Sequence, residues 1–359
     1  MNNIKKYNLF ILISTFARSI IELFSIVILY KLGFSFNNII IFYIIYYLFC
    51  AITSSISLSF SNKINPKYIL ISSSLIYAFS FYYLSNITIN LTSLIIFAIL
   101  LAIGNYTYHP IRHLYALKVL DKKNKGIASV LIYNYIAITL ASYLGPYLTN
   151  KIGLDLIIII LIITSIFSII PLLFIKNENK LEKIKLNVKK LPRRKLLFFI
   201  CEQFKVIFLL LQPLYLYLYV SDNIEYVGMF NAILGIASIV TIYLFSKTNN
   251  YKFFHINLFL CLTLIFKINI TNPNTLLMLA ILEGIGIKIF EVVSTKNIYN
   301  IEKENTISYL ILVELIFCLV SMTIFIIFYF INNLKNMLYI CIFFIFLCGI
   351  INPKIDNQN

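Results

Sequence analysis

Residues 7–31 read YNLFILISTFARSIIELFSIVILYK, an apolar stretch of membrane-spanning length that carries Arg18 and Glu22 near its middle. A helix needs about 20 mostly apolar residues to cross the hydrocarbon core. A charge at the centre of that core costs about 2.5 kcal/mol or more. The four-residue spacing puts both charges on one face of the helix. The segment therefore predicts a membrane helix whose charged face points into a polar interior.

The composition extends this prediction to the whole chain. Of its 359 residues 60% are hydrophobic, with a mean hydropathy of +0.90, whereas a soluble domain is about 45–50% apolar. The net charge of +16 does not predict a nucleic-acid partner, because the basic residues lie in short loops. The six cysteines fall in apolar stretches without metal-type spacing. We therefore expect an integral membrane protein with no disulfide, metal or other cofactor.

The hydropathy pattern predicts an all-α fold of twelve transmembrane helices. We place them at 8–30, 38–60, 68–86, 91–111, 127–149, 154–175, 196–219, 227–246, 253–270, 275–295, 306–331 and 335–352. With the N-terminus in the cytoplasm, cytoplasmic segments hold 23 of the 30 Lys and Arg residues, external loops three and spans four. This bias follows the positive-inside rule. It predicts a multi-pass protein of the cytoplasmic (inner) membrane with both termini in the cytoplasm.

One polar segment divides the chain into two parts of six spans each. It reads KNENKLEKIKLNVKKLPRRK, residues 176–195, and is strongly basic. We expect it to be a cytoplasmic linker that touches anionic headgroups. It separates an N-terminal six-helix bundle at 1–175 from a C-terminal six-helix bundle at 196–359. Weak similarity between the two parts favours two pseudo-symmetric halves, an architecture that is typical of transporters.

The polar residues inside the spans follow a rhythm of three helices. The first, fourth, seventh and tenth spans carry most of them, the eleventh carries Glu314, and the third, sixth and twelfth have no charge in their interiors. Lys267 lies near the outer end of the ninth span, where we expect its side chain to reach the membrane interface. A random helix bundle would not be expected to show this pattern. The pattern predicts a central pathway between the halves.

This rhythm resembles that of the major facilitator superfamily, in which spans 1, 4, 7 and 10 line a central cavity. The loop NKINPKY at 62–68 is similar to the family's basic motif between spans 2 and 3. Lys63 and Lys67 stand at its basic positions, whereas Asn62 and Asn65 replace its Asp and Gly. In span 5 the dipeptide Gly145-Pro146 is similar to a motif of drug–proton antiporters. YHPIRHLYALKVLDKKNKG, at 108–126, resembles a poorly characterised bacterial subgroup of the superfamily.

The polar rhythm and the resemblance place a solute and coupling cavity between the halves. We expect its lining to comprise Arg18, Glu22, Asn105, His109, Glu202, Lys205, Gln212, Glu283, Lys288 and Glu314. We expect a gate at the cytoplasmic mouth made of Lys63, Arg112, His113 and Glu291. The spacing leaves a second interpretation open, in which Arg18–Glu22 and Glu202–Lys205 are structural ion pairs that fasten a helix to its neighbours.

Two further patterns bear on coupling and on metal binding. Glu283 and Glu314 have no cation one turn away on their own helix. Burial favours the protonated form of such a carboxylate, so either is a candidate proton carrier unless another helix supplies a cation. His109 and His113 have the spacing of a metal-binding pair, but Arg112 lies between them and opposes a cation. We expect a polar lining there.

The sequence thus predicts a secondary transporter that moves a small polar solute by alternating access. No nucleotide-binding P-loop is present, so we expect an ion gradient, with protons as one option, or facilitated diffusion. The protein would be no enzyme, and a monomer suffices for this architecture. The alternative is a membrane-embedded enzyme or lipid-precursor flippase of the cell envelope, whose candidate groups are His109, His113, Asp121 and Glu291.

Overall fold

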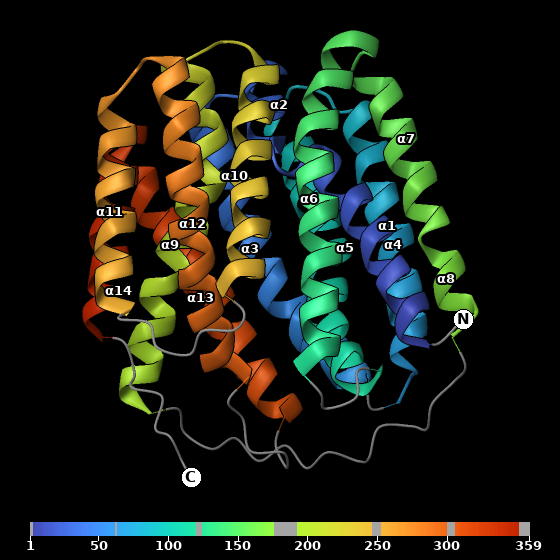
Figure 1. Ribbon diagram of the computed structural model, residues 1–359. Helices are drawn as coiled ribbons and strands as arrows, with labels where there is room; N and C mark the ends of the chain where they lie inside the picture. The colour runs from blue at the N-terminus through green and yellow to red at the C-terminus, as the bar shows by residue number, and fades with distance from the viewer. Residues whose placement is uncertain are drawn as a thin grey trace.

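The computed structural model consists of helices that run side by side between two ends of the molecule (Figure 1). It describes residues 3–61, 63–119, 124–175, 192–245, 253–299 and 306–351. Within these ranges every regular element is a helix. The first helix begins and the last helix ends at the same end of the bundle, here named the terminal end (Figure 1). The opposite end is named the far end.

The helices form two sets along the chain, here named the first and second halves. The first half holds α1 Asn3–Glu22, α2 Ser25–Lys31, α3 Phe36–Phe60, α4 Pro66–Ser85, α5 Leu91–Val119, α6 Asn124–Ile152, α7 Leu154–Phe167 and α8 Ile169–Leu173. The second half holds α9 Arg193–Tyr219, α10 Ile224–Phe245, α11 Phe253–Asn269, α12 Pro273–Tyr299, α13 Thr306–Ile331 and α14 Leu334–Ile351. Residues 176–191 of the predicted linker lie outside the described residues, so the division into two bundles joined by it stays a prediction.

The fourteen helices of the described ranges make twelve crossings, because the first and sixth predicted spans are each divided into two helices. In the sixth span, Pro171 lacks the N–H that would bond to the Phe167 carbonyl four residues earlier, and the helix is interrupted at Ser168. In the first span, the amide of Phe24 bonds to the carbonyl of Ile21, three residues back, at 3.1 Å. This tighter turn separates α1 from α2.

α5 extends beyond its predicted end and passes through Pro110 to Val119. A proline inside a helix leaves the carbonyl four residues earlier without its usual donor. Here that carbonyl belongs to Tyr106, and it accepts a hydrogen bond from the hydroxyl of Ser57 on α3 at 3.2 Å. The neighbouring helix thus supplies the missing donor, and α5 continues.

Nine stretches in the described part of the chain are long and apolar enough to cross a membrane by themselves. The others are α6, α12 and the 17-residue α11. α12 carries Glu283, Lys288 and Glu291, and α6 is rich in Asn, Thr, Ser and Tyr. Both lie against other helices, α6 between α1 and α10 and α12 between α10 and α11. Their polar side chains can therefore bond to neighbouring helices, as Tyr135 of α6 does to Glu291 of α12 and Lys267 of α11 does to Glu283 of α12.

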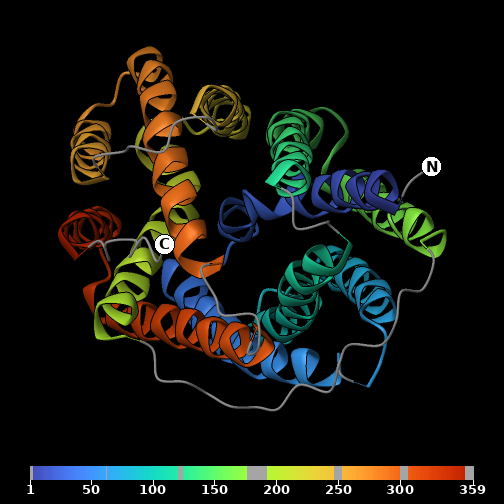
Figure 2. The ribbon, with the colours of Figure 1, turned by 60° about the horizontal axis from the view of Figure 1, so that its bottom comes forward.

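The two halves meet mainly along two pairs of helices. α3 packs on α13 and α6 packs on α10, with a smaller contact between α2 and α9. Seen from the terminal end, the α3–α13 and α6–α10 pairs lie on opposite sides of the molecule (Figure 2). Within the first half, α5 packs on α3 and α4, and α1 packs on α6 and α7. Within the second, α14 packs on α9 and α11.

Aromatic rings and small residues fill these contacts between the halves. The ring of Phe325 on α13 stacks on that of Tyr43 on α3, with centroids 5.0 Å apart. On the other side, Gly228 of α10 lies against Pro146 and the carbonyl of Ser142 on α6, so that the two backbones approach closely. Small residues allow such close helix packing in membranes.

Replacing Gly228 by Leu is expected to destabilise the protein, because a Cβ at this position would overlap the Pro146 ring and the Ser142 carbonyl. Overpacking of this kind costs about 1–3 kcal/mol. The six cysteines are all buried, so the temperature at which they begin to react with a maleimide dye measures unfolding. Met229→Leu, at an exposed neighbouring position, is the control. Equal midpoints for the two variants would contradict the packing described here.

Candidate functional site

The guanidinium of Arg18 is buried between α1, α4 and α5. Arg18 is 5% exposed. Its Nη1 donates to Asn105 Oδ1 at 2.8 Å and to the carbonyl of Gly104 at 3.3 Å. Its Nη2 donates to Ser73 Oγ at 2.7 Å. The planar, forked guanidinium can bond to several acceptors at once, and here it joins three helices of the first half.

Two tyrosine rings enclose the same guanidinium. Its Cζ lies 4.3 Å from the centroid of the Tyr77 ring and 3.9 Å from that of Tyr108. An aromatic face attracts a cation electrostatically. The hydroxyl of Tyr77 donates to the backbone carbonyl of Arg18 at 2.7 Å. Both rings therefore contact the charge from neighbouring helices, Tyr77 from α4 and Tyr108 from α5.

Glu22 is joined to Arg18 through the amide of Asn105. Asn105 Nδ2 donates to Glu22 Oε1 at 2.7 Å, while its Oδ1 accepts from Arg18. The Tyr77 hydroxyl lies 3.3 Å from Glu22 Oε2. Every one of these partners belongs to α1, α4 or α5. The contacts favour the structural interpretation of this pair, and a role of Arg18 and Glu22 in solute binding stays a prediction.

Lys267 and Glu283 form a buried ion pair between α11 and α12. Lys267 Nζ lies 2.8 Å from Glu283 Oε2 and 3.0 Å from Oε1, and the two side chains are 1% and 0% exposed. The rings of Phe208 and Phe230 lie 5.2 and 4.6 Å from Nζ. The expectation for Lys267 is therefore wrong, because a carboxylate inside the bundle holds it away from the membrane interface. For Glu283 the open alternative applies, in which another helix supplies the cation.

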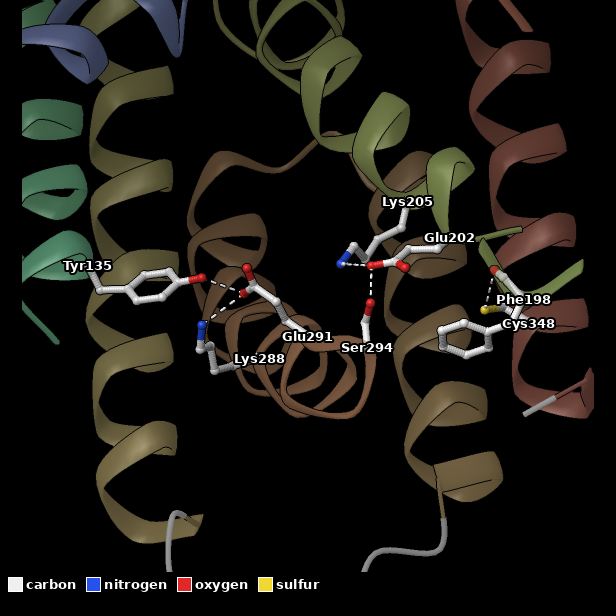
Figure 3. A network of polar contacts seen from close by, with 8 residues as sticks. All are labelled: Tyr135, Phe198, Glu202, Lys205, Lys288, Glu291, Ser294 and Cys348. Carbon is white, nitrogen blue, oxygen red and sulfur yellow. Dashed lines mark hydrogen bonds and ion pairs between the residues drawn. The ribbon is translucent and has the colours of Figure 1, made fainter. Parts of the chain in front are cut away.

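Glu291 on α12, whose side chain is 38% exposed, is the point where a charge of the second half meets the first half (Figure 3). Lys288 Nζ lies 2.8 Å from Glu291 Oε2. The hydroxyl of Tyr135 on α6 donates to the same carboxylate. The ammonium of Lys288 also lies over the Tyr135 ring, 3.4 Å from its centroid. Tyr135 thus contacts both members of the pair.

A second pair, Glu202 and Lys205, lies on α9 beside α12 (Figure 3). The hydroxyl of Ser294 on α12 donates to Glu202 Oε1. Lys205 Nζ is 3.9 Å from the same oxygen and 4.7 Å from the centroid of the Phe290 ring. Both side chains are buried, at 7% and 8% exposed. Together with Lys288 and Glu291 they make a group of two cations and two anions, here named the four-charge group.

The remaining predicted lining residues lie apart from this group. Gln212 is buried on α9, and its Oε1 has no hydrogen-bond partner among the described residues. Glu314 is partly buried on α13, and the charge of Arg112 on α5 acts on it electrostatically. The ring of His109 lies near Tyr108, with centroids 5.4 Å apart.

The predicted gate residues are only partly brought together. Arg112 donates to Asn134 Oδ1 on α6 at 3.1 Å, Glu291 lies in the four-charge group, and Lys63 is exposed beyond the end of α3. The side chain of His113 lies outside the described part of the chain. Among the described side chains, no three His, Cys, Asp or Glu residues gather as a metal site would require.

The sequence did not predict the uncharged residues that bond to these charged side chains. Tyr135 and Ser294 bond to the carboxylates of α12 and α9, and Ser73 and Tyr77 bond to Arg18. Lys67, noted only for the loop motif, donates to backbone carbonyls at the end of α8. The stretch SSS at 72–74 in an otherwise apolar span was a usable signal for Ser73. The tyrosines gave none, since the chain has 26 of them.

Replacing Arg18 by Ala or by Lys is expected to lower the unfolding midpoint strongly. Breaking a buried, fully bonded charge network costs about 3–5 kcal/mol, and a lysine cannot reproduce the fork that reaches both Asn105 and Ser73. Lys151→Ala, at the exposed end of α6, is the control and should be neutral. An Arg18→Lys protein as stable as the wild type would show that the fork is not required.

The Lys267–Glu283 pair is expected to show strong coupling in a double-mutant cycle. Lys267→Met or Glu283→Leu alone leaves an uncompensated buried charge, which costs about 3–5 kcal/mol. The double variant removes both charges and should recover most of that loss. The measurement is the thiol-reactivity midpoint of the four proteins. Additive losses in the double variant would contradict a direct pair.

Comparison with solved structures shows the fold. A mutant of the nucleoside transporter NupG superposes with a TM-score of 0.73 at 9% identity, over 97% of this chain and 98% of that one. A bacterial homologue of the human lysosomal transporter Spinster, in an inward-facing and occupied conformation, superposes with a TM-score of 0.67 at 12% identity, over 97% and 95% of the two chains. At such identities the likeness concerns the fold alone.

Comparison of sequences shows the family. No curated protein sequence matches this chain. The family model described as the Major Facilitator Superfamily matches residues 8–353, which is nearly the whole chain. The predicted all-α fold of twelve transmembrane helices and the predicted family are both confirmed. The chain is a multi-pass membrane protein that belongs to the major facilitator superfamily of transporters.

Proposed function

We propose that this protein is a secondary active transporter that moves a small polar solute across the cytoplasmic membrane by alternating access. Its terminal end would face the cytoplasm, in line with the positive-inside bias of its loops. The observation that carries the proposal is the four-charge group, which lies within membrane-spanning helices and meets the first half at Tyr135. Charges at such depth are expensive and are typical of solute or ion pathways.

We expect the contacts between the halves to allow two arrangements, one closed and one open at the terminal end. A single hydrogen bond, such as the one from Tyr135 to Glu291, contributes only about 0.5–1.5 kcal/mol net when water or solute can replace the partner. The contacts of Phe325 with Tyr43 and of Gly228 with Pro146 lie toward the far end of their helices. The terminal end can therefore part at Tyr135 while the far end stays closed.

Glu314 is the proposed proton site. It is partly buried on α13, and no hydrogen bond or ion pair to the described residues holds its carboxylate. The charge of Arg112, which belongs to the other half, acts on it electrostatically. Protonation of Glu314 would remove that attraction between the halves. Proton uptake would thus favour parting of the terminal end and couple the gradient to the movement.

The alternative of a membrane enzyme or lipid flippase depends on His109, His113, Asp121 and Glu291. The side chains of His113 and Asp121 lie outside the described part of the chain, and no observation on His109 or Glu291 favours that alternative. Both halves lie in one chain, so the proposed mechanism requires only a monomer.

Alternating access is expected to appear as two populations of distances between the halves. Spin labels at Lys63→Cys and Arg194→Cys report on the terminal end, and labels at Ile89→Cys and Asn274→Cys report on the far end, because all four positions are exposed. The six buried native cysteines stay unlabelled in the folded protein. Pulsed electron paramagnetic resonance in nanodiscs should show that one pair lengthens as the other shortens.

Lowering the pH should increase the population that is open at the terminal end, and Glu314→Gln should abolish that response. Tyr135→Phe should raise the same population at constant pH, whereas Tyr133→Phe, at an exposed position on the same helix, should not. A single unchanging distance for both label pairs under all these conditions would contradict alternating access.

A further inference from the structure

Lys205 differs from the other cations inside the predicted spans, because no described residue accepts a hydrogen bond from it. Its side chain is 7% exposed, and Nζ lies 3.9 Å from Glu202 Oε1, beyond hydrogen-bond distance. Its other close neighbour is the ring of Phe290. Each of the other three cations donates to an oxygen at 2.7 or 2.8 Å: Arg18, Lys267 and Lys288.

Glu202 lacks the complementary partner, a hydrogen-bond donor. Its Oε1 accepts a hydrogen bond from Ser294, whereas its Oε2 is buried and has no partner among the described residues. The side chain is 8% exposed. A buried carboxylate oxygen without a donor is unfavourable, and buried polar atoms of this kind are uncommon enough to require an explanation. A buried ammonium and a buried oxygen, one helical turn apart on α9, thus both lack a hydrogen-bond partner among the described residues.

The position of this pair connects it with the contact between the halves. Lys205 and Glu202 point from α9 toward α12, on whose neighbouring turn Lys288 and Glu291 meet Tyr135 (Figure 3). A ligand on the pair would therefore lie beside the residues that join the two halves. In the first half, by contrast, both Nη atoms of Arg18 already donate hydrogen bonds to acceptors of the protein.

We propose that Lys205 and Glu202 bind the head group of an α-amino acid. The ligand's carboxylate would accept from Lys205 Nζ, and its ammonium would donate to Glu202 Oε2. The nearest atoms of the two protein groups, Lys205 Nζ and Glu202 Oε1, are 3.9 Å apart, and Oε2 belongs to the same carboxylate. This short span suits a ligand whose two charges lie on neighbouring carbon atoms, as in an α-amino carboxylate. The inference rests on the proposed transport function and names the class of its solute.

The charges of the site favour a zwitterion over a simple ion. The four-charge group is neutral as a whole, and a zwitterion keeps it neutral. A lone anion on Lys205 would face the carboxylate of Glu202, and a lone amine on Glu202 would face the ammonium of Lys205. A metal ion would meet the ammonium groups of both Lys205 and Lys288. An added net charge at this depth carries the membrane penalty that a neutral ligand avoids.

Thermal unfolding of the purified full chain tests this proposal. The probes are a pool of the common L-amino acids without cysteine, a pool of straight-chain carboxylates from acetate to hexanoate, and a pool of the matching alkylamines. At concentrations well above its dissociation constant, a ligand of the native state raises the midpoint by about 2–4 °C in a protein of this size. We expect the amino-acid pool alone to do so. The double variant Glu202→Gln/Lys205→Met should lose the response, and Lys31→Met, at an exposed position, should keep it.

The outcomes separate this proposal from the proposed function. An equal shift with the carboxylates or the amines, an unchanged response in the double variant, or no shift with amino acids would each overturn the amino-acid site. The double variant removes both charges of the pair together, so neither is left uncompensated. Its unfolding midpoint without ligand tests whether it folds. The distance measurements between the halves need no solute, so alternating access can stand when the amino-acid site fails.

Discussion

A charge inside the hydrocarbon layer has no water to bond with, so the protein must supply every partner. The side chain of Asn105 meets this requirement for both charges of α1, because an amide carries an acceptor and two donors. It accepts from Arg18 and donates to Glu22. The two charges therefore share one partner, and α1 is fixed to α4 and α5. The rest of the first half packs around this junction.

The second half satisfies its charges differently. Lys267 and Glu283 face each other directly across α11 and α12, which fastens those helices without an intermediary. Glu202 and Lys205 are left incompletely bonded on α9. The first half thus holds a fully bonded junction at Arg18, whereas the second half keeps charged groups on α9 that can still form new contacts. The two halves of the chain therefore need not have the same role.

Sequence patterns predicted the depth of these residues well and their partners poorly. Hydropathy and loop charge placed the twelve spans, and the polar rhythm placed Glu202, Lys205, Lys288 and Glu291 on the helices that carry them. The partner of Glu283 could not be predicted in this way. A hydropathy pattern fixes how deep a residue lies and which face of its helix it occupies, but not which neighbouring helix that face meets. Lys267 therefore looked like an interfacial lysine, although Glu283 lies directly across from it.

The contact between α6 and α10 has a mechanical consequence. At Gly228 and Gly235 the two helices touch through small groups, beside Pro146 and Thr139. Surfaces without interlocking long side chains can roll on one another along this stretch, while the hydrogen bond from Asn150 to Glu225 joins the two helices at their far ends. The contact between α3 and α13, where Tyr43 stacks on Phe325, belongs to the helix pair on the opposite side of the molecule (Figure 2). A line through the α6–α10 contact and the α3–α13 contact is a natural hinge axis, about which each half can tilt as a rigid body.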